Sequence, residues 1–269
     1  MRPRVLITGA SGGIGAELAR LFAADGYELV LAARNLGALD ALAAELRASR
    51  GVPVQTVRSD LSEPGAAERL WTGAAGPDGT VDVLVNNAGT GVYGPVAEQD
   101  ADALSRMLEL NVVALTALTR LALPGMLRRR SGKILNLASV VGYQPSGPRL
   151  AAYYASKSYV LAFSRGLRRE LEDTGVSVTT LSPGPTRTGF EGHSGMPETR
   201  AYRWFGKSDP AAVARAGYRG LRRGRASVVP GWANRILAFA GELQPRGIAL
   251  AVNRFLLEPV RRSRGEVRG

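Results

Sequence analysis

Residues 4–15 read RVLITGASGGIG, an apolar run that passes directly into a glycine-rich turn. The run predicts a buried strand, and the residues after the turn predict a helix. Glycine allows a tight turn and a close backbone approach to a pyrophosphate, while the start of a helix offers free N–H groups and a partial positive charge. An ordinary glycine-rich connection is the alternative reading. The candidate phosphate-binding residues are Gly9, Ser11, Gly13, Ile14 and Gly15.

Four further apolar runs alternate with helical patterns along the chain. They lie at residues 29–31, 81–85, 134–137 and 176–179. After the first of these runs, the spacing of Leu39, Leu42 and Leu46 places the three leucines on one helix face. Repeated alternation of strand and helix indicates a parallel sheet covered on both faces. We therefore expect an α/β fold: a doubly wound, Rossmann-type parallel sheet in a single domain, with a C-terminal helical extension.

The pattern changes after residue 183. Residues 184–208 mix glycine, proline, threonine and aromatic residues without periodicity, which predicts a loop. Asp209-Pro210 has the pattern of an N-cap followed by a first helical residue, for a helix that ends near Arg222.

The last part of the chain predicts a short strand and two helices. The strand is expected at Val228-Val229, and two amphipathic helices are expected between residues 232 and 257, broken near Gln244-Pro245. We therefore predict a main domain of residues 1–230. Residues 231–269 would form an amphipathic helical extension with a basic tail.

The end of the second predicted strand indicates the type of dinucleotide. In dinucleotide-binding folds an acidic residue near this point binds the ribose 2′-hydroxyl of NAD, whereas an arginine accommodates the 2′-phosphate of NADP. The sequence here is Ala32-Ala33-Arg34-Asn35, with an arginine and no acid. An arginine that simply lies on the surface is the alternative. We predict NADP(H) as the cofactor, with Arg34 at the 2′-phosphate.

A tyrosine and a lysine four positions apart indicate acid–base chemistry. Tyr153 and Lys157 would share one face of a helix. Free tyrosine titrates near pH 10, and a nearby ammonium favours the phenolate and lowers this pKa. Tyr153 would then give and take a proton near neutral pH. A helix that holds both residues by chance is the alternative, and Tyr154 lies on a similar face.

These motifs, taken in order over residues 4–190, resemble the short-chain dehydrogenase/reductase superfamily. Residues 8–15 are similar to its TGxxxGxG turn, and Asp60-Leu61 to the pair that contacts adenine. Residues 86–89 are similar to its NNAG motif, in which Asn87, Ala88 and Gly89 line the cofactor site. The remaining matches are the catalytic tetrad Asn111, Ser139, Tyr153 and Lys157, and the nicotinamide-binding residues Pro183, Gly184, Thr186 and Thr188.

The resemblance implies a mechanism for moving a hydride between a nicotinamide and a ketone or secondary alcohol. Tyr153 would protonate the carbonyl oxygen in reduction, and Ser139 would position that oxygen. Lys157 would bind the nicotinamide ribose and lower the pKa of Tyr153. Asn111 would hold a water that links Lys157 to solvent. The family pattern Y-x-[AS]-[ST]-K selects Tyr153 over Tyr154, and the family also implies a homodimer or homotetramer.

Composition narrows the classes of function. The 269-residue chain has no cysteine and one histidine, His193, so neither a disulfide nor a metal site is predicted. The first residues lack the apolar run of a signal peptide, and no stretch approaches the ~20 apolar residues that span a bilayer. We therefore expect a cytoplasmic protein.

The formal net charge of +12 comes almost entirely from arginine. Because the basic residues are scattered and no nucleic-acid-binding motif surrounds them, no nucleic acid partner is predicted. One explanation of the arginine excess is genome composition together with a solvated surface. The other is attraction to cofactor phosphates, an acidic carrier or an anionic membrane.

Two other functions compete with catalysis. A non-catalytic NADP-binding sensor should lack a member of the tetrad, and none is missing here. A peripheral membrane protein on the same scaffold would use the tail from residue 232 to residue 268, where apolar residues alternate with arginines as in an interfacial helix. Such a stripe otherwise covers its own core or a partner subunit.

The predicted loop at 184–208 corresponds to the segment that closes over substrate in the family. Its large apolar side chains favour a bulky apolar substrate, such as a 3-oxoacyl, steroid-like or polyketide ketone; packing within the loop is the alternative. His193 lies in the same loop and is expected on the surface. The apolar side chains are Phe190, Met196, Tyr202, Trp204 and Phe205.

Overall fold

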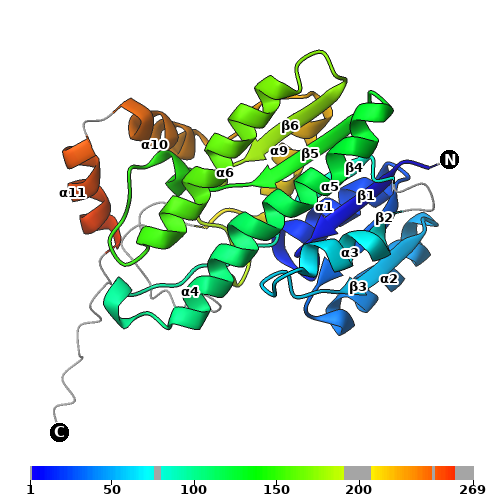
Figure 1. Cartoon of the computed structure of the whole chain (residues 1–269), viewed down its shortest axis with the longest axis horizontal. Coiled ribbons are helices and arrows are strands. Elements are labelled where there is room, and N and C mark those ends of the chain that lie inside the picture. Colours follow the sequence, from blue (N-terminus) through cyan, green and yellow to red (C-terminus); the bar gives the residue numbers. More distant parts are fainter. Residues whose placement is uncertain (1, 76–79, 191–206, 244–245, 258–269) are drawn as a thin grey trace, which may run out of the picture.

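In the computed structural model, which describes residues 2–75, 80–190, 207–243 and 246–257, a twisted parallel sheet runs through the centre of the molecule (Figure 1). The strand order is β3-β2-β1-β4-β5-β6-β7. The chain order reverses between β1 and β4, so the doubly wound, Rossmann-type sheet is confirmed. The strands are β1 (Arg4–Thr8), β2 (Glu28–Ala33), β3 (Val54–Arg58), β4 (Val83–Asn86), β5 (Gly132–Leu137), β6 (Val176–Leu181) and β7 (Ser227–Val228).

Two layers of helices cover the sheet. Val5 and Ile7 of β1 face one layer, and Leu6 between them faces the other. Because both faces are buried, the central strands are almost continuously apolar. The first layer consists of α1 (Gly13–Ala24), α2 (Leu36–Arg50) and α9 (Pro210–Arg222), and the second of α3 (Ala66–Ala74), α5 (Leu115–Arg128) and α6 (Ala151–Glu170).

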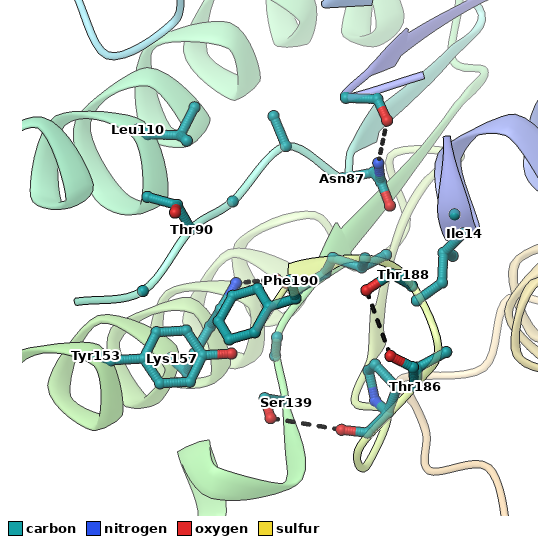
Figure 2. A pocket seen from close by; sticks show the side chains of 18 of the residues that line it. Ile14, Asn87, Thr90, Leu110, Ser139, Tyr153, Lys157, Thr186, Thr188 and Phe190 are labelled. Carbon is teal, nitrogen blue, oxygen red and sulfur yellow. Dashed lines mark hydrogen bonds between the residues drawn. The ribbon is translucent and has the colours of Figure 1, made fainter. Parts of the chain in front are cut away.

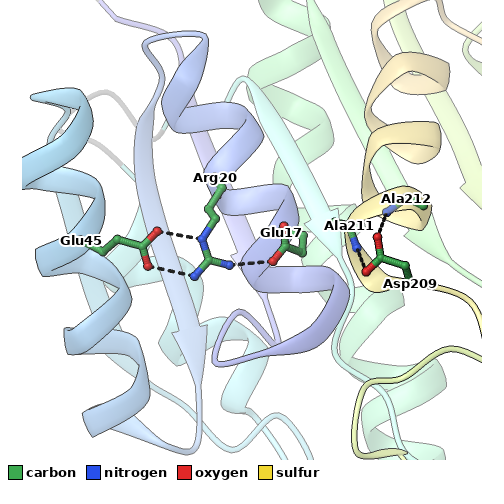
Figure 3. Close-up of polar contacts among 6 residues, drawn as sticks. All are labelled: Glu17, Arg20, Glu45, Asp209, Ala211 and Ala212. Carbon is green, nitrogen blue, oxygen red and sulfur yellow. Dashed lines mark hydrogen bonds and ion pairs between the residues drawn. The ribbon is translucent and has the colours of Figure 1, made fainter.

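Ion pairs and a cap fix the helices of the first layer (Figure 3). The guanidinium of Arg20 on α1 donates to both carboxylate oxygens of Glu45 on α2, at 2.8 and 2.9 Å, and to Glu17 at 2.8 Å. At the start of α9 the Asp209 carboxylate accepts from the N–H groups of Ala211 and Ala212. The N-cap predicted at Asp209 is therefore confirmed.

Helices α1 and α9 pack side by side although they lie far apart in the sequence. The rings of Phe22 and Tyr218 meet edge-on, with centroids 4.8 Å apart. The Tyr218 hydroxyl donates to Asp25, 193 positions earlier in the chain, at 2.5 Å. Arg222 binds the same carboxylate. Helices α1 and α9, the first and last of the sheet domain, are thus held together by an aromatic contact and by bonds to the Asp25 carboxylate.

A continuous helical segment crosses the second layer. It consists of α4 (Ala101–Leu108), the π-helical turn η2 (Glu109–Ala114) and α5. An 18-residue window within it has a mean hydropathy of 1.5, so by length and composition it meets the requirement for a membrane span. From the sequence we expect no stretch that is long and apolar enough to span a bilayer. By length and composition, that expectation is wrong. The buried face of α5 packs against the sheet as a core helix does, through Leu118, Ala122 and Met126.

The C-terminal extension contains α10 (Trp232–Leu243) and α11 (Arg246–Leu257), as predicted. Both lie at the end of the molecule away from β2 and β3 (Figure 1). The Gln144 side chain donates to the Leu237 carbonyl of α10 at 2.8 Å, and the Asn253 side chain of α11 donates to the Ser146 carbonyl at 2.7 Å. The predicted break at 244–245 and the basic tail lie outside the described residues.

Candidate active site

The glycine-rich turn between β1 and α1 has little room for side chains. Gly9 and Gly13 have φ angles of +64° and +54°, in the left-handed region that favours glycine. A Cβ at Gly9 would lie 2.9 Å from the Cα of Ala88, and one at Gly15 would overlap the Gly9 carbonyl oxygen. At the start of α1, Gly12 supplies no side-chain cap. The turn therefore presents open backbone N–H groups, which fits a pyrophosphate.

The segment after β4 is fixed to this turn by hydrogen bonds. The Thr8 hydroxyl accepts from the N–H groups of Asn87 and Ala88, each at 3.0 Å. The Asn87 amide in turn donates to the carbonyls of Thr8 at 2.9 Å and Gly9 at 3.0 Å. Figure 2 shows Asn87 beside the turn that carries Ile14. The carboxyl ends of β1 and β4 thus form a rigid crevice where the strand order reverses.

The residues predicted for the adenosine end lie at the ends of β2 and β3. Burial would raise the pKa of Asp60, but hydrogen bonds from Ser62 and the charges of Arg34 and Arg106 outweigh it, so the pKa lies below its ordinary value. Arg34 is exposed, and in the described part of the chain no carboxylate lies within ion-pair distance of it. The guanidinium is therefore available to an anionic group of a ligand.

Asn111 lies in the π-helical turn η2 and is almost fully buried. Its side chain accepts from the Thr90 N–H at 3.0 Å and donates to the Thr90 carbonyl at 2.9 Å. It also donates to the Ser156 hydroxyl at 3.1 Å. A Cβ at Gly89 would lie only 3.2 Å from the Asn111 side-chain oxygen. π-turns of this kind are frequent at functional sites, and here one aims an amide at the segment between β4 and the cavity.

Tyr153 and Lys157 point from α6 toward the same cavity (Figure 2). Burial raises the pKa of Tyr153 to about 12, although hydrogen bonding with Ser139 lowers it in part. Burial lowers the pKa of Lys157 to about 8. Its ammonium donates to the Leu137 carbonyl at 3.0 Å and lies 5.9 Å from the centre of the Tyr153 ring. The pKa of Tyr153 is thus higher than the low value expected from the sequence, because burial affects it more than the neighbouring lysine does.

The segment after β6 lies opposite α6. The Ser139 hydroxyl faces the Pro183 carbonyl at 3.4 Å, and Thr186 donates to the Gly184 carbonyl at 2.9 Å. Thr188 lies against the glycine-rich turn, since a Cβ at Gly13 would come within 2.9 Å of its methyl group. The predicted nicotinamide segment therefore closes the side of the crevice between the turn and Ser139.

A single cavity of about 770 Å³ joins these groups. Among the predicted site residues only Gly15 and Asn111 lie behind its wall; the others line it. One end lies at Arg34 and Asp60, and the other is apolar. The cavity can therefore hold an extended dinucleotide with a second, apolar molecule beside it.

The apolar end includes residues that the sequence did not point to. Tyr154, which is buried, packs in a cluster with Leu150 and Leu257, against which Tyr153 also packs, and it lines the cavity as well. The only sign of these residues in the sequence is the amphipathic pattern of the last two helices. That pattern shows that a helix has a buried face, but it does not show what the face packs against. The cavity residues contributed by α10 and α11 are Asn234, Leu237, Asn253, Leu256 and Leu257.

Phe190 is the one member of the predicted apolar loop set that lies within the described residues. Its ring centroid is 5.4 Å from that of Tyr153, and it lines the cavity. His193 and the other four aromatic or methionine residues of this loop lie outside the described residues. Thr186 pairs with Ser208 in an isolated bridge.

Comparisons with known proteins agree with this arrangement. A family model described as short chain dehydrogenase matches residues 3–198. Dehydrogenase/reductase SDR family member 7B of Bos taurus is 42% identical over 189 residues, which cover 68% of this chain and 58% of the relative. The chain thus spans a little over half the length of the first curated relatives that it matches.

Solved structures are similar over most of the chain. A short-chain dehydrogenase from Sphingobium yanoikuyae in complex with NADPH has a TM-score of 0.77 and 35% identity, covering 89% of this chain and 92% of that one. A bulky-bulky ketone specific alcohol dehydrogenase from Comamonas testosteroni has a TM-score of 0.74 and 31% identity, covering 89% and 92%. A relative from Burkholderia phymatum in complex with NAD has a TM-score of 0.80 and 27% identity, covering 97% and 98%.

Proposed function

The chain belongs to the short-chain dehydrogenase family, and on that premise we propose that it reduces bulky, apolar ketones with NADPH or oxidises the corresponding alcohols with NADP. The observation that carries the proposal is one cavity that joins the glycine-rich turn and Arg34 to Tyr153 and then to an apolar end. When bound, the nicotinamide supplies or accepts the hydride.

Tyr153 is the proposed proton donor. With a pKa near 12 it stays protonated at neutral pH, which suits protonation of a carbonyl oxygen. Ser139, whose hydroxyl interacts with that of Tyr153, would hold the same carbonyl oxygen. Lys157, buried and below its usual pKa, would bind the nicotinamide ribose. Asn111 would support this arrangement through Thr90 and Ser156.

Arg34 supports NADP(H) over NAD(H). The guanidinium fork matches phosphate oxygens, and a hydrogen bond to a charged group contributes about 1.5–3 kcal/mol, or roughly 10- to 150-fold in affinity. Arg34→Gln should therefore weaken NADPH by that factor and leave NADH nearly unchanged, as measured by fluorescence titration at low salt. Arg50→Gln, on the exposed last turn of α2, is the matched control. Equal wild-type dissociation constants for NADPH and NADH would refute the assignment.

The apolar end supports a bulky substrate. Leu150, Leu256 and Leu257 line it together with Phe190. The Comamonas testosteroni and Sphingobium yanoikuyae relatives support a ketone substrate and NADPH respectively, by their descriptions. A panel of ketones graded from acetone to steroid-like compounds, followed by NADPH absorbance, tests this. We expect kcat/KM to rise with apolar size, and turnover confined to the smallest ketones would contradict it.

A non-catalytic NADP-binding sensor remains the second candidate function. It would bind NADPH with the affinity expected from Arg34 and turn over no compound in the panel. The tetrad argues against it, because Ser139, Tyr153 and Lys157 line the cavity and Asn111, directly behind its wall, is hydrogen-bonded to Ser156.

A further inference from the structure

One face of α10 carries large apolar side chains in solvent. The positions are spaced by four, three and four residues, which places them in one stripe along the helix. Soluble proteins seldom gather such side chains on one surface unless something covers them. The α10 stripe consists of Trp232, Ile236, Phe239 and Leu243, which are 77%, 59%, 66% and 67% exposed.

The opposite face of α10 is fixed on the protein. Ala238 is buried, and Leu237 lines the cavity while its carbonyl accepts from Gln144. Glu242 binds Arg165 of α6. The orientation of the helix is therefore set by these contacts, so the stripe does not result from a helix that has failed to dock.

The next helix adds to the apolar surface. Leu250 and Val252 of α11 are 42% and 44% exposed. The inner residues Leu256 and Leu257 of the same helix line the apolar end of the cavity. The two helices thus separate the cavity from the outer apolar surface by one layer of chain.

Charge favours an anionic partner for this surface. Arg235 is exposed beside the stripe, and the one acid of α10, Glu242, is paired with Arg165. The sequence after α11 adds four arginines, at positions 261, 262, 264 and 268, against two glutamates. The chain as a whole carries +12. Exposed aromatic and aliphatic side chains with arginines beside them are the composition of an interfacial helix.

A second copy of the chain fits this surface less well. A symmetric pair would place Arg235 of each copy near the same basic surface of the other.

We propose that the α10 stripe inserts into the surface of an anionic lipid membrane, with Arg235 beside it bound to the headgroups. The proposal does not depend on the reductase activity, because the stripe residues lie outside the cavity. It places the apolar end of the cavity next to the lipid, where apolar ketones concentrate.

Vesicle sedimentation tests the proposal. The full chain is mixed with vesicles of phosphatidylcholine, alone or with phosphatidylglycerol, and we expect binding to the anionic vesicles. The double variant Trp232→Ser/Phe239→Ser should bind them roughly tenfold less or weaker still, because two large apolar groups no longer enter the lipid. Arg235→Gln should weaken binding about fivefold. The matched control is Val96→Ser/Leu127→Ser, which removes two exposed apolar side chains elsewhere and should bind like the wild type.

A second readout follows the stripe itself. Trp232 should show a blue-shifted emission on anionic vesicles, and Trp232→Phe should lose that shift. Unchanged thermal unfolding of each variant shows that α10 still folds. Equal binding of the wild type and the stripe variant would overturn the proposal. So would a dimer in lipid-free ultracentrifugation that Trp232→Ser/Phe239→Ser converts to a monomer, because the stripe would then bind a second copy.

Discussion

At the scale of single residues, the hydroxyl of Tyr153 is the group whose loss should be felt most in catalysis. Tyr153→Phe removes only that hydroxyl. General acid catalysis contributes ~10²–10⁴-fold, so kcat should fall by that order while the NADPH dissociation constant stays the same. Tyr154→Phe is the matched control, since Tyr154 packs against Leu257 and Leu150. A larger loss for Tyr154→Phe would reassign the proton donor.

Burial of Lys157 should make the free energy of unfolding depend on pH. Its folded pKa of about 8 lies below the ordinary value of 10.5, so the unfolded chain binds its proton more tightly. Stability is therefore reduced below pH 8 and rises as the pH increases from 8 toward 10.5. Relative to Lys157→Met, the wild type should gain about 2 kcal/mol in free energy of unfolding between pH 7 and pH 9.5.

Urea unfolding of both proteins at the two pH values measures this gain. Tyr153 has the opposite sign: its folded pKa of about 12 lies above 10, so its contribution is lost only above pH 10. Between pH 7 and pH 9.5 the change in free energy of unfolding therefore reports on Lys157 and not on Tyr153. A constant difference between the wild type and Lys157→Met from pH 7 to 9.5 would show that the ammonium is not buried as described.

At the scale of elements, the helix caps offer a test of how α9 begins. Asp209→Ala removes the acceptor for the N–H groups of Ala211 and Ala212 and should cost about 1 kcal/mol of stability. Asp209→Asn keeps one of the two acceptor oxygens and should cost less. The midpoint of urea unfolding measures both. An equal loss in the two variants would mean that the charge, rather than the cap, stabilises α9.

The central strands could be predicted from the sequence, and the edge strand β3 could not. Residues 5–7 and 29–31 are buried on both faces of the sheet and so read as unbroken apolar runs. At the edge, Val54 is buried while Gln55 and Arg58 are exposed, and this short polar mixture resembles a loop. Strand β7 was located to within one residue.

The candidate site divides in the same way. The pairing of Tyr153 with Lys157 follows from helix geometry, whereas the pKa of each depends on burial that no local pattern reveals. The π-turn around Asn111 was also missed, because one extra residue in a helical turn leaves no periodic signal. The wall formed by Leu256 and Leu257 was missed because an amphipathic pattern shows a buried face but not its partner.

At the scale of the whole molecule, one contiguous crevice connects elements from most of the chain, from the turn at Gly9 to Leu257 of α11. The expected homodimer or homotetramer and the cytoplasmic location stay predictions. The proposed membrane surface lies on α10, away from the edge of the sheet formed by β3 (Figure 1). One molecule can therefore bind lipid through its C-terminal helices and keep the dinucleotide end of the crevice in water.

The packing of α1 against α9 has a consequence during synthesis. Phe22 leaves the ribosome long before Tyr218, its ring partner, has been translated. At 5–20 residues per second, the 193 positions between Asp25 and Tyr218 correspond to roughly 10 to 40 s. For that time the side of α1 that packs against α9 has no cover and is a target for chaperones and proteases, whereas its contacts with β1, β2 and α2 can already form. Nascent chains arrested before Asp209 should be cleaved rapidly near α1 by a limited protease, while released full-length chains resist it; equal resistance would mean that the first helices fold without α9.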